Sequence, residues 1–447
     1  MESKKPIIYL PVEVEVRELV SKIHLAIRGA QKGNKVIIGQ KSILNKLIKY
    51  LDKGIYVSGG AFSNYVPFFK NIVENGFKIC VLEEEGLITF KKKFYLDMRT
   101  DKNCLDFVSR YYLWGDHQYD MLASKYPSKK EKFLVTGNPR FDFLSKRNQN
   151  IYSDEINIIK GKYKNFCLVC TCFPSINHYD RKLNVIEHLK SKNTLRTKES
   201  IIHYKNYQKI KKKTFKEFLK FIEEYSFINP NINIVIRPHP GESNVPYEIF
   251  TKKFKNVFIE RNYSVHSWII ACQFLLHHYC TTSIEALALD TESYCIRPES
   301  YKKGEYEFPF KCSNTFKKGK DMSEDLNKRG VVRRNINKSS YTKYVKNIIK
   351  CNSSKLIIED INKFHKRSKS FGKIKKYNKL KEFLKKLYIF VLSNLYNLRR
   401  SPYEINKLRK IDKLIIKNYI DKIEGKQAYK NYRIQEIGKN LVSLEKK

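Results

Sequence analysis

A histidine held between two prolines is the clearest candidate for chemistry in this 447-residue chain, in the motif Arg-Pro-His-Pro-Gly-Glu from Arg237 to Glu242. The motif directly follows an apolar run, Ile232 to Ile236, that is typical of a buried strand. At the carboxyl end of such a strand, Arg237 and His239 can both donate hydrogen bonds to phosphate oxygens. The prolines fix the local backbone. The pattern predicts a phosphate-binding loop that includes Glu242; alternatively, His239 only caps or fills the domain surface.

A second candidate lies between His277 and Pro298, which reads as strand, hydroxyl-rich turn, helix and strand. Thr281, Thr282 and Ser283 fall where unpaired backbone N–H groups and the positive end of a helix dipole meet, a favourable place for an anion. Glu285 falls in the first helical turn, where it caps these N–H groups or reaches a sugar hydroxyl. An ordinary capped helix explains the segment equally well.

A third segment, Val135 to Leu144, ends an apolar run in a Gly-Asn-Pro-Arg turn. Gly137 permits positive φ and a close backbone approach to a ligand, and Asn138 follows it in the turn. Arg140 can reach a phosphate from the other side of a cleft. A plain turn between strand and helix is the open alternative.

Carboxylates that can serve as a general base gather at two places. Glu83 to Phe90 begins with three glutamates after an apolar run, and their mutual repulsion would raise at least one pKa. Any of the three is a candidate base there, although a solvated acidic loop fits as well. Near the start of the chain, Glu13 and Glu15 share one side of an alternating segment, and Glu15 is the second candidate base. Either of these two glutamates can instead pair with Arg17.

Charge points to anionic partners without choosing among them, because 88 Lys and Arg residues outnumber 45 acidic residues to give a formal charge of +43. No zinc-finger spacing or RNA-binding aromatic motif accompanies this charge, so we expect no specific nucleic acid partner. No run approaches the roughly 18 apolar residues of a membrane span. Neither a P-loop nor a Gly-x-Gly-x-x-Gly fingerprint occurs, so ATPase and NAD-dependent functions lose support and no cofactor is expected.

The ten cysteines sit mostly in apolar runs, where they behave as small buried hydrophobes. The cluster Cys167 to Cys172 offers metal-like spacing, but no second Cys or His pair follows it, so we expect no metal site. With no leader at the start, the chain is expected to be cytoplasmic, with peripheral attachment to the inner face of the plasma membrane left open.

Strands alternating with helices predict an α/β fold with two parallel, doubly wound sheets facing a cleft. Six strand-like runs occur between Pro6 and Gly137, and five more between Asn165 and Pro298. We expect an N-terminal Rossmann-like acceptor domain (1–145), a linker (146–164), a C-terminal Rossmann-like donor domain (165–334) and a basic helical extension (335–447).

The extension contains a basic amphipathic stretch from Phe383 to Leu398, with apolar residues three and four apart. Such a helix can lie in an anionic membrane interface, which makes a membrane surface one expected partner of the tail. The same periodicity fits a helix that packs its apolar face on the second domain.

Taken in order, these motifs resemble the GT-B superfamily, the fold shared by UDP-N-acetylglucosamine 2-epimerase and many glycosyltransferases. Glu83 to Leu87 is similar to the epimerase's His-Val-Glu-Ala-Gly-Leu element, which makes Glu84 the counterpart of its active-site glutamate. Gly137 to Leu144 is similar to its Gly-Asn-x-x-x-Asp-x-Leu segment, Arg237 to Pro240 to its His-Pro element, and Thr281 to Pro298 to its donor-binding helix.

The chain start, Tyr9 to Gly39, resembles bacterial surface carbohydrate biosynthesis proteins, which are akin to Kdo transferases whose His-Pro motif contacts the donor nucleotide. The resemblance covers roughly residues 6 to 300. Thr281, Thr282 and Ser283 stand where the epimerase has a glycine pair, and Leu82, Glu83 and Glu85 replace its His, Val and Ala. Those departures argue against epimerisation.

The resemblance implies a metal-independent glycosyltransferase that moves a sugar from a nucleotide-sugar donor, CMP-Kdo-like or otherwise, to a glycan or lipid-linked acceptor of the bacterial surface. A nucleotide-sugar epimerase, a polyol-phosphate transferase and a non-enzymatic basic scaffold bound to membrane or RNA are the alternatives.

Overall fold

The computed structural model of the chain describes residues 5–85, 92–144, 146–192, 194–195, 197–299, 308–367 and 379–447. These residues divide into two compact units. The first unit combines residues 1–86, 99–143 and 341–447, and the second combines residues 87–98 and 144–340. Both units are α/β structures with parallel sheets, as the alternation of apolar runs predicted.

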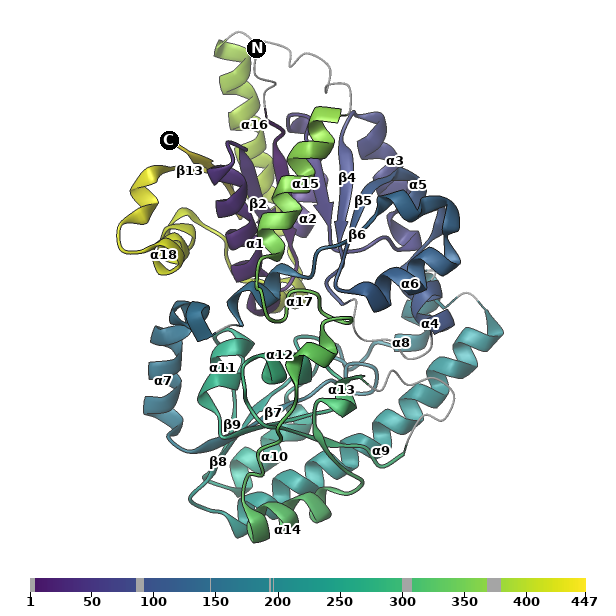
Figure 1. The fold of residues 1–447 in the computed structure, drawn as a ribbon, viewed down its shortest axis with the longest axis vertical. Coiled ribbons are helices and arrows are strands. Elements are labelled where there is room, and N and C mark those ends of the chain that lie inside the picture. Colours follow the sequence, from purple (N-terminus) through teal and green to yellow (C-terminus); the bar gives the residue numbers. More distant parts are fainter. Residues whose placement is uncertain are drawn as a thin grey trace. The chain divides into compact units, whose positions relative to one another are not determined.

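The described part of the first unit contains an eight-stranded sheet in the order β13-β14-β2-β1-β3-β4-β5-β6 (Figure 1). β1 to β6 run parallel, with Ile8 opposite Val36 where β1 pairs with β2. All six strand predictions are confirmed. The strands are β1 (Ile8–Val12), β2 (Val36–Gln40), β3 (Ile55–Ser58), β4 (Lys78–Leu82), β5 (Val108–Leu113), β6 (Phe133–Val135), β13 (Tyr432–Gly438) and β14 (Leu441–Lys446).

Helices of the first unit follow the strands that they connect. α1 carries apolar residues three and four apart, and the face that they form is buried. The helices are α1 (Glu15–Gln31), α2 (Lys41–Leu47), α3 (Val66–Glu74), α5 (Lys102–Phe107), α6 (Asp116–Lys125), α15 (Ser353–Arg367), α16 (Lys379–Leu398), α17 (Pro402–Lys407) and α18 (Lys413–Glu424), with shorter 3₁₀ turns between them.

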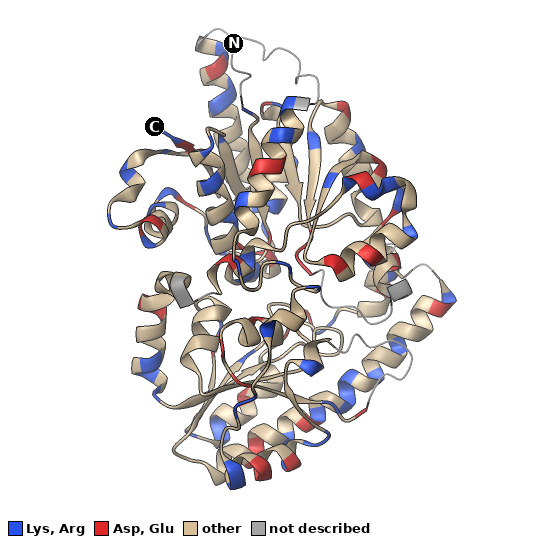
Figure 2. Cartoon of the chain, viewed as in Figure 1, with Lys and Arg blue, Asp and Glu red and all other residues tan. Residues whose placement is uncertain are grey.

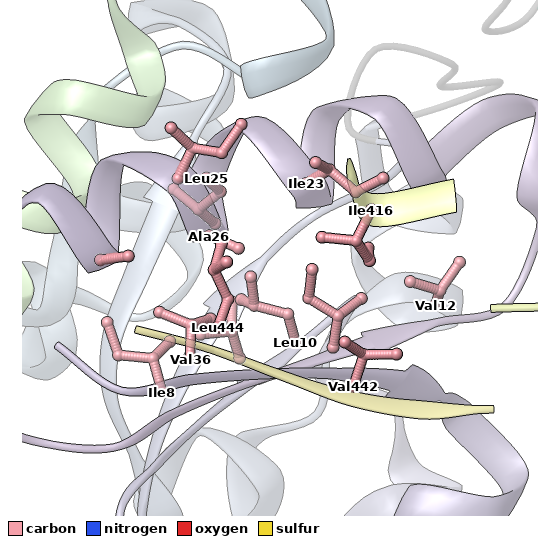
Figure 3. Close-up of a cluster of buried hydrophobic side chains, with 14 of the residues drawn as sticks. Ile8, Leu10, Val12, Ile23, Leu25, Ala26, Val36, Ile416, Val442 and Leu444 are labelled. Atoms are coloured by element: carbon pink, nitrogen blue, oxygen red, sulfur yellow. The ribbon is translucent and has the colours of Figure 1, made fainter. Parts of the chain in front are cut away.

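The C-terminal segment differs from the helical tail expected from residue 335 onward. β14 pairs antiparallel with β2, with Val442 opposite Ile38, and β13 pairs with β14. α15 packs along α1. Figure 3 shows Ile416, Val442 and Leu444 among the buried side chains of α1 and β1. The end of the chain therefore contributes side chains to the core of the first unit. It also pairs with β2, which would otherwise be an unpaired edge of the sheet.

Gly137 shows how closely this segment is fitted to the rest of the unit. It adopts φ +78°, and an added Cβ would lie 2.7 Å from the Ser353 Oγ and 2.8 Å from the Asn347 Nδ2. Glycine is thus required here by backbone conformation and by packing against residues 347–353. The close approach is to the chain itself, whereas the sequence suggested a close approach to a ligand.

We expect Gly137→Ala to lower the free energy of unfolding by about 2–4 kcal/mol, because the new methyl group meets both a positive φ and two close polar atoms. Urea denaturation followed by circular dichroism measures this change. Gly161→Ala is the matched control, since a Cβ there has nothing within 4 Å. An unchanged midpoint for Gly137→Ala would mean that residues 347–353 do not pack against the turn.

The second unit contains a six-stranded parallel sheet among its described residues, in the order β12-β11-β10-β7-β8-β9. The five predicted strands are confirmed, and β12 was missed. The strands are β7 (Phe166–Cys170), β8 (Asn233–Arg237), β9 (Val257–Ile259), β10 (Phe274–His277), β11 (Ser293–Ile296) and β12 (Asn314–Phe316).

The helices of the second unit include a long one, α9, whose capping box at Thr197 and Ser200 fixes its start. The predicted linker region forms a 3₁₀ turn (Lys146–Tyr152) and α7, which packs on α11. The helices are α4 (Lys92–Arg99), α7 (Ser153–Tyr163), α8 (Val185–Ser191), α9 (Lys198–Ile228), α10 (Val245–Lys253), α11 (Val265–Ala271), α12 (Thr282–Ala288), α13 (Phe308–Lys311) and α14 (Gly319–Arg329).

Candidate functional site

Strand order locates the candidate site of the second unit. Numbered within the unit, its strands lie in the order 3-2-1-4-5-6, because β9, β8 and β7 lie on one side and β10, β11 and β12 on the other. The order reverses between β7 and β10. Ligands of open α/β sheets bind outside the carboxyl ends of the strands at such a switch point. The segments that follow β7, β8 and β10 are therefore the ones to consider.

A buried carboxylate, Glu242, joins the segment after β7 to the predicted phosphate-binding loop after β8. It accepts hydrogen bonds from the Thr171 hydroxyl (2.9 Å), the Phe173 N–H (2.8 Å) and the Tyr247 hydroxyl (2.7 Å). The backbone N–H of His239 donates at 3.3 Å to Glu242 Oε1, the oxygen that also accepts from Thr171 and Phe173. Burial raises the pKa of this carboxyl group. The sequence predicted that Glu242 binds the donor. In the structure, its hydrogen bonds hold the loop in place.

Two arginines hold the same loop. The Arg261 guanidinium donates to the carbonyls of Pro238 (3.3 Å), His239 (3.1 Å) and Glu242 (2.8 Å). Arg237, predicted to bind phosphate, is buried and donates to the carbonyls of residues 262 and 263 at 2.6 and 3.1 Å. Burial lowers its pKa to about 10. Both guanidiniums are engaged by backbone carbonyls, which favours a positioning role for Arg237.

His239 is the member of the loop that reaches the surface. Its side chain is half-buried, and its Nδ1 accepts a hydrogen bond from the Gly241 N–H at 3.0 Å. A neutral imidazole that accepts at Nδ1 carries its proton on Nε2, so Nε2 is the donor. The Gly241 N–H orients the ring, and Glu242 and Arg261 hold the loop, so Nε2 is positioned as a hydrogen-bond donor at the carboxyl edge of the sheet.

The hydroxyl-rich turn follows β10 as predicted, and a strained residue precedes it. Tyr279 has φ +48°, which costs a residue with a side chain about 1–2 kcal/mol. Ser283 is buried and its hydroxyl donates to the Cys280 carbonyl at 2.9 Å, so this hydroxyl is committed within the turn. Thr281 is partly exposed and Thr282 lies at the start of α12. Of the three predicted hydroxyls, Thr281 is the most accessible.

Glu285 lies deeper than the sequence suggested. Its side chain is fully buried in α12, with Oε1 3.7 Å from the His266 Nε2. The His266 Nδ1 lies 2.8 Å from the Tyr152 hydroxyl. For Glu285 to contact a sugar or ribose hydroxyl as predicted, the hydroxyl would have to enter below the Thr281–Ser283 turn, next to the buried side chains of Tyr152 and His266.

Two cysteines span the switch point. The thiol of Cys172, after β7, forms a hydrogen bond with Cys280, after β10, and both side chains are partly exposed. This hydrogen bond, followed by those from Thr282, lowers the pKa of the Cys280 thiol to about 6. The pKa of Cys172 is raised by the same bond and by burial. Cys280 is thus the more reactive thiol of the pair.

We expect iodoacetamide to alkylate Cys280 before the other cysteines, with a rate that rises through about pH 6 and then levels off. The sign follows from the lowered pKa, because the thiolate is the nucleophile and is already formed at neutral pH. Cys272 is the internal control, since it is also partly exposed but burial raises its pKa. Mass spectrometry of tryptic peptides reads both sites. Equal labelling of the two cysteines at pH 7 would contradict the assigned geometry.

Two cations at the same edge were not predicted as site residues. Lys211 of α9 is buried, and its Nζ donates to the Cys172 carbonyl at 2.9 Å. Arg297, immediately after β11, lies with its guanidinium 4.1 Å from the centre of the Phe310 ring. A lysine inside a long charged helix carries no signal in the sequence, whereas Arg297 sits at a strand end and could have been found by that placement.

The acidic cluster of the first unit is an ion-pair network, so its carboxylates do not crowd one another uncompensated. Glu83 accepts from the Tyr111 hydroxyl at 2.9 Å and pairs with Arg99. Glu85 pairs with Arg17 (2.8 Å) and Arg99 (2.9 Å). The rest of the predicted segment, from Gly86 to Phe90, lies outside the described residues.

Glu84 is buried, as Glu83 is, and it pairs with a lysine of α1. Its Oε1 lies 2.8 Å from the Lys22 Nζ, and both side chains are less than a tenth exposed. Glu18 of α1, which the sequence did not single out, is buried nearby, and burial raises its pKa with Glu84 adding to the rise. Two neighbouring carboxyl groups with different cation contacts suit an acid and base pair.

Glu13 and Glu15 do not pair with Arg17, which contacts Glu18 and Glu85. Glu13 lies between Lys41 (2.6 Å) and Lys407 (2.8 Å), whose charges hold its pKa well below the usual range despite burial. Glu15 begins α1, accepts from the Arg409 N–H at 2.9 Å, and has a pKa raised by burial. A raised pKa keeps Glu15 among the candidate bases.

Asn138 and Arg140, predicted to bind the donor, are buried and hold the acidic loop. The Asn138 side chain donates to the Glu83 carbonyl at 3.1 Å and accepts from the Arg140 N–H at 3.0 Å. The Arg140 guanidinium donates to the Glu84 carbonyl at 3.3 Å. These contacts, together with the packing of Gly137, favour a positioning role for the whole turn.

A cavity of about 720 Å³ lies at the amino-terminal edge of the second sheet, because its lining includes Ile232, Gln273 and Glu292, which precede β8, β10 and β11. Its edge is opposite to the switch point. Within the described residues, no three His, Cys, Asp or Glu side chains group as ligands for a metal ion.

Comparisons with known proteins identify the fold. No protein-family model matches the chain, and no curated protein is similar in sequence. Among solved structures, the wall teichoic acid polymerase TagF matches with a TM-score of 0.52 and 12% identity, covering 82% of this chain and 91% of that one. The UDP-GlcNAc 2-epimerase of Methanocaldococcus jannaschii, solved with UDP-GlcNAc and UDP, matches with a TM-score of 0.50 and 13% identity, covering 80% and 99%. This chain has the GT-B fold.

A TagF variant soaked with CDPG also matches, with a TM-score of 0.51 and 11% identity over 81% of this chain and 89% of that one. The GT-B fold is the one that the order of the motifs implied, so the predicted fold class is confirmed. In this GT-B chain, the residues around the switch point have two roles. Arg237, Glu242 and Arg261 hold the loops in place. The partly exposed residues are His239, Thr281 and Cys280.

Proposed function

We propose that the protein is a glycosyltransferase that moves a sugar from a nucleotide-sugar donor to a bacterial surface polysaccharide or glycolipid acceptor. One observation carries this proposal: three loops converge at the switch point of a GT-B sheet around a histidine whose Nε2 is oriented as a donor. Neighbours that bind UDP-GlcNAc or were soaked with CDPG support a nucleotide-linked donor.

In this proposal the donor's phosphates meet His239 and the turn around Thr281. Lys211 and Arg297 supply positive charge behind them, and Arg237, Glu242 and Arg261 keep the loop in place. During transfer, the bond between the sugar's anomeric carbon and the phosphate oxygen breaks, and negative charge grows on the departing phosphate. Oriented donors at that position stabilise the charge in the transition state more than in the ground state.

The first unit supplies the acceptor side of the proposal. A carboxylate, Glu84 or Glu15, takes the proton of the acceptor hydroxyl, and the oxygen of that hydroxyl forms the new bond to the anomeric carbon. Glu285 retains the role of contacting a ribose or sugar hydroxyl. A lipid-linked acceptor requires the enzyme to work at a membrane surface, so peripheral attachment to the inner face of the plasma membrane is part of the same proposal.

Two alternatives within the fold are separated by one experiment. The purified chain is incubated with UDP-, CMP-, GDP- and CDP-linked sugars and with CDP-linked polyols, first alone and then with a bacterial envelope acceptor fraction. Label that enters the acceptor only from a nucleotide sugar supports the proposal. Isomerised UDP-GlcNAc without any acceptor would make the protein an epimerase, and label only from a CDP-polyol would make it a polyol-phosphate transferase.

A further inference from the structure

The amphipathic helix α16 packs on the first unit with its less apolar face. It lies against β13 and α2, and the side chains that it buries there are Ile389 and Ser393. The Ser393 hydroxyl accepts from the Lys439 N–H at 2.7 Å, and Lys385 pairs with Asp52 at 2.6 Å. Polar contacts therefore anchor this face. The sequence left open that the apolar face packs on the second domain; among the described residues of the first unit, the side chains of that apolar face are exposed.

The opposite face of α16 is a continuous apolar surface turned outward. Leu380, Leu384, Leu387, Val391, Leu395 and Leu398 recur at three- and four-residue spacing, which places them in one stripe along a straight helix. Phe383, Tyr388 and Phe390 widen the stripe on both sides. These nine side chains are between 46% and 79% exposed. An apolar surface of this extent on a water-soluble domain marks an interaction site.

Positive charge borders this surface. Lys381 and Lys386 on α16 and Arg399 directly after it are exposed, and so is Lys49, which lies over the ring of Tyr50, the residue that contacts Tyr388. The acidic residues nearby are already paired, Glu382 with Lys386 at 2.9 Å and Asp52 with Lys385. Figure 2 shows Lys and Arg also spread over other helices, so what distinguishes α16 is the combination of cations with outward apolar side chains.

We propose that α16 lies in the interface of an anionic lipid bilayer, with its apolar stripe among the acyl chains and the bordering cations at the head groups. Leu and Phe on one face with Lys and Arg beside them are the composition of interfacial helices. No helix of the described residues is long and apolar enough to cross a membrane, so the helix lies on the surface.

The width of the apolar face argues for a bilayer over a second copy of the chain. A two-helix seam uses two positions of each seven-residue repeat, which here are Leu380, Leu384, Leu387, Val391, Asn394 and Leu398. The nine exposed apolar side chains include Phe383, Tyr388, Phe390 and Leu395 outside that seam, and this wider face suits a flat lipid surface.

Vesicle flotation with the full chain tests this inference without any assay of activity. We expect the protein to float with vesicles of phosphatidylcholine containing about 30% phosphatidylglycerol and to remain unbound with phosphatidylcholine alone. Leu384→Glu with Leu387→Glu is expected to lower partitioning by more than tenfold. Each of Lys381→Glu and Lys386→Glu is expected to lower it about fivefold on anionic vesicles.

Leu414→Glu in α18 and Ile249→Glu in α10 are matched controls, because these residues are 64% and 63% exposed outside α16. They are expected to leave flotation unchanged, and circular dichroism melts check that every variant is folded. Wild-type protein that stays unbound on anionic vesicles would overturn the inference. So would light scattering that shows a dimer lost in the double Leu variant, which would assign the face to a second copy.

Discussion

Replacing His239 by alanine is expected to lower kcat/KM for sugar transfer by about a thousandfold, or about 4 kcal/mol of transition-state stabilisation. The loss arises because Nε2 is the oriented donor at the switch point, whereas the loop itself is held by Arg261 and Glu242. His239 Nδ1 accepts from the Gly241 N–H, but the hydrogen bonds of Arg261 and Glu242 hold the loop without the ring, so the melting temperature should fall by no more than about two degrees.

His188→Ala is the matched control, since His188 is an exposed histidine of α8 in the same unit. Steady-state rates with the best donor of the panel and a thermal melt of each variant provide the measurement. Full activity in His239→Ala would remove the histidine from the mechanism. A large fall in melting temperature together with the lost rate would instead give His239 a role in holding the loop.

The second large effect concerns the buried pair of Lys22 and Glu84. Lys22→Met leaves the Glu84 carboxylate without the Nζ that lies 2.8 Å away, and removing one partner of a buried pair costs about 3–5 kcal/mol of unfolding free energy. Glu84→Gln should abolish transfer and also lower stability, because it leaves the buried Lys22 Nζ without a carboxylate partner. Urea denaturation and transfer rates measure the two effects separately.

The double variant Lys22→Met with Glu84→Gln separates catalysis from structure. We expect it to recover most of the stability lost in Lys22→Met, because no unpaired charge remains, and to stay inactive. Recovery of both stability and activity would show that the pair is structural and would leave Glu15 as the candidate base. An active Glu84→Gln variant would lead to the same conclusion.

β1 to β11 could be predicted because parallel strands buried on both faces are continuous apolar runs. The end of the chain could not, because β13 alternates buried and exposed residues and the β13–β14 hairpin follows more than 80 residues of Lys-rich sequence. A signal was present: Tyr432 and Ile434 alternate with polar residues, and Gly438 and Asn440 mark a turn. Charge in the surrounding sequence concealed this hairpin.

The candidate site was predictable as a set of loops but not as a set of roles. Strand ends and prolines singled out the segment that holds His239, and the structure places this segment directly after β8. They could not show that Arg237 donates to backbone carbonyls. They also could not show that Arg261 donates to carbonyls of the loop, which lie 19 to 23 residues before it in the sequence. Likewise, Glu84 was visible as an acidic residue after a strand, while its partner Lys22 lies on the inner face of α1. Roles depend on contacts between segments that no local pattern encodes.

Hydrogen exchange with a bound nucleotide sugar tests the central claim most directly, that the donor binds at the carboxyl edge of β7, β8 and β10. A saturating donor from the panel is expected to slow exchange in peptides covering residues 171–177, 237–244 and 279–285. Peptides around the 720 Å³ cavity, such as residues 289–292, should exchange as in the free protein. Protection confined to that opposite edge, or no change in exchange with any nucleotide sugar, would contradict this account.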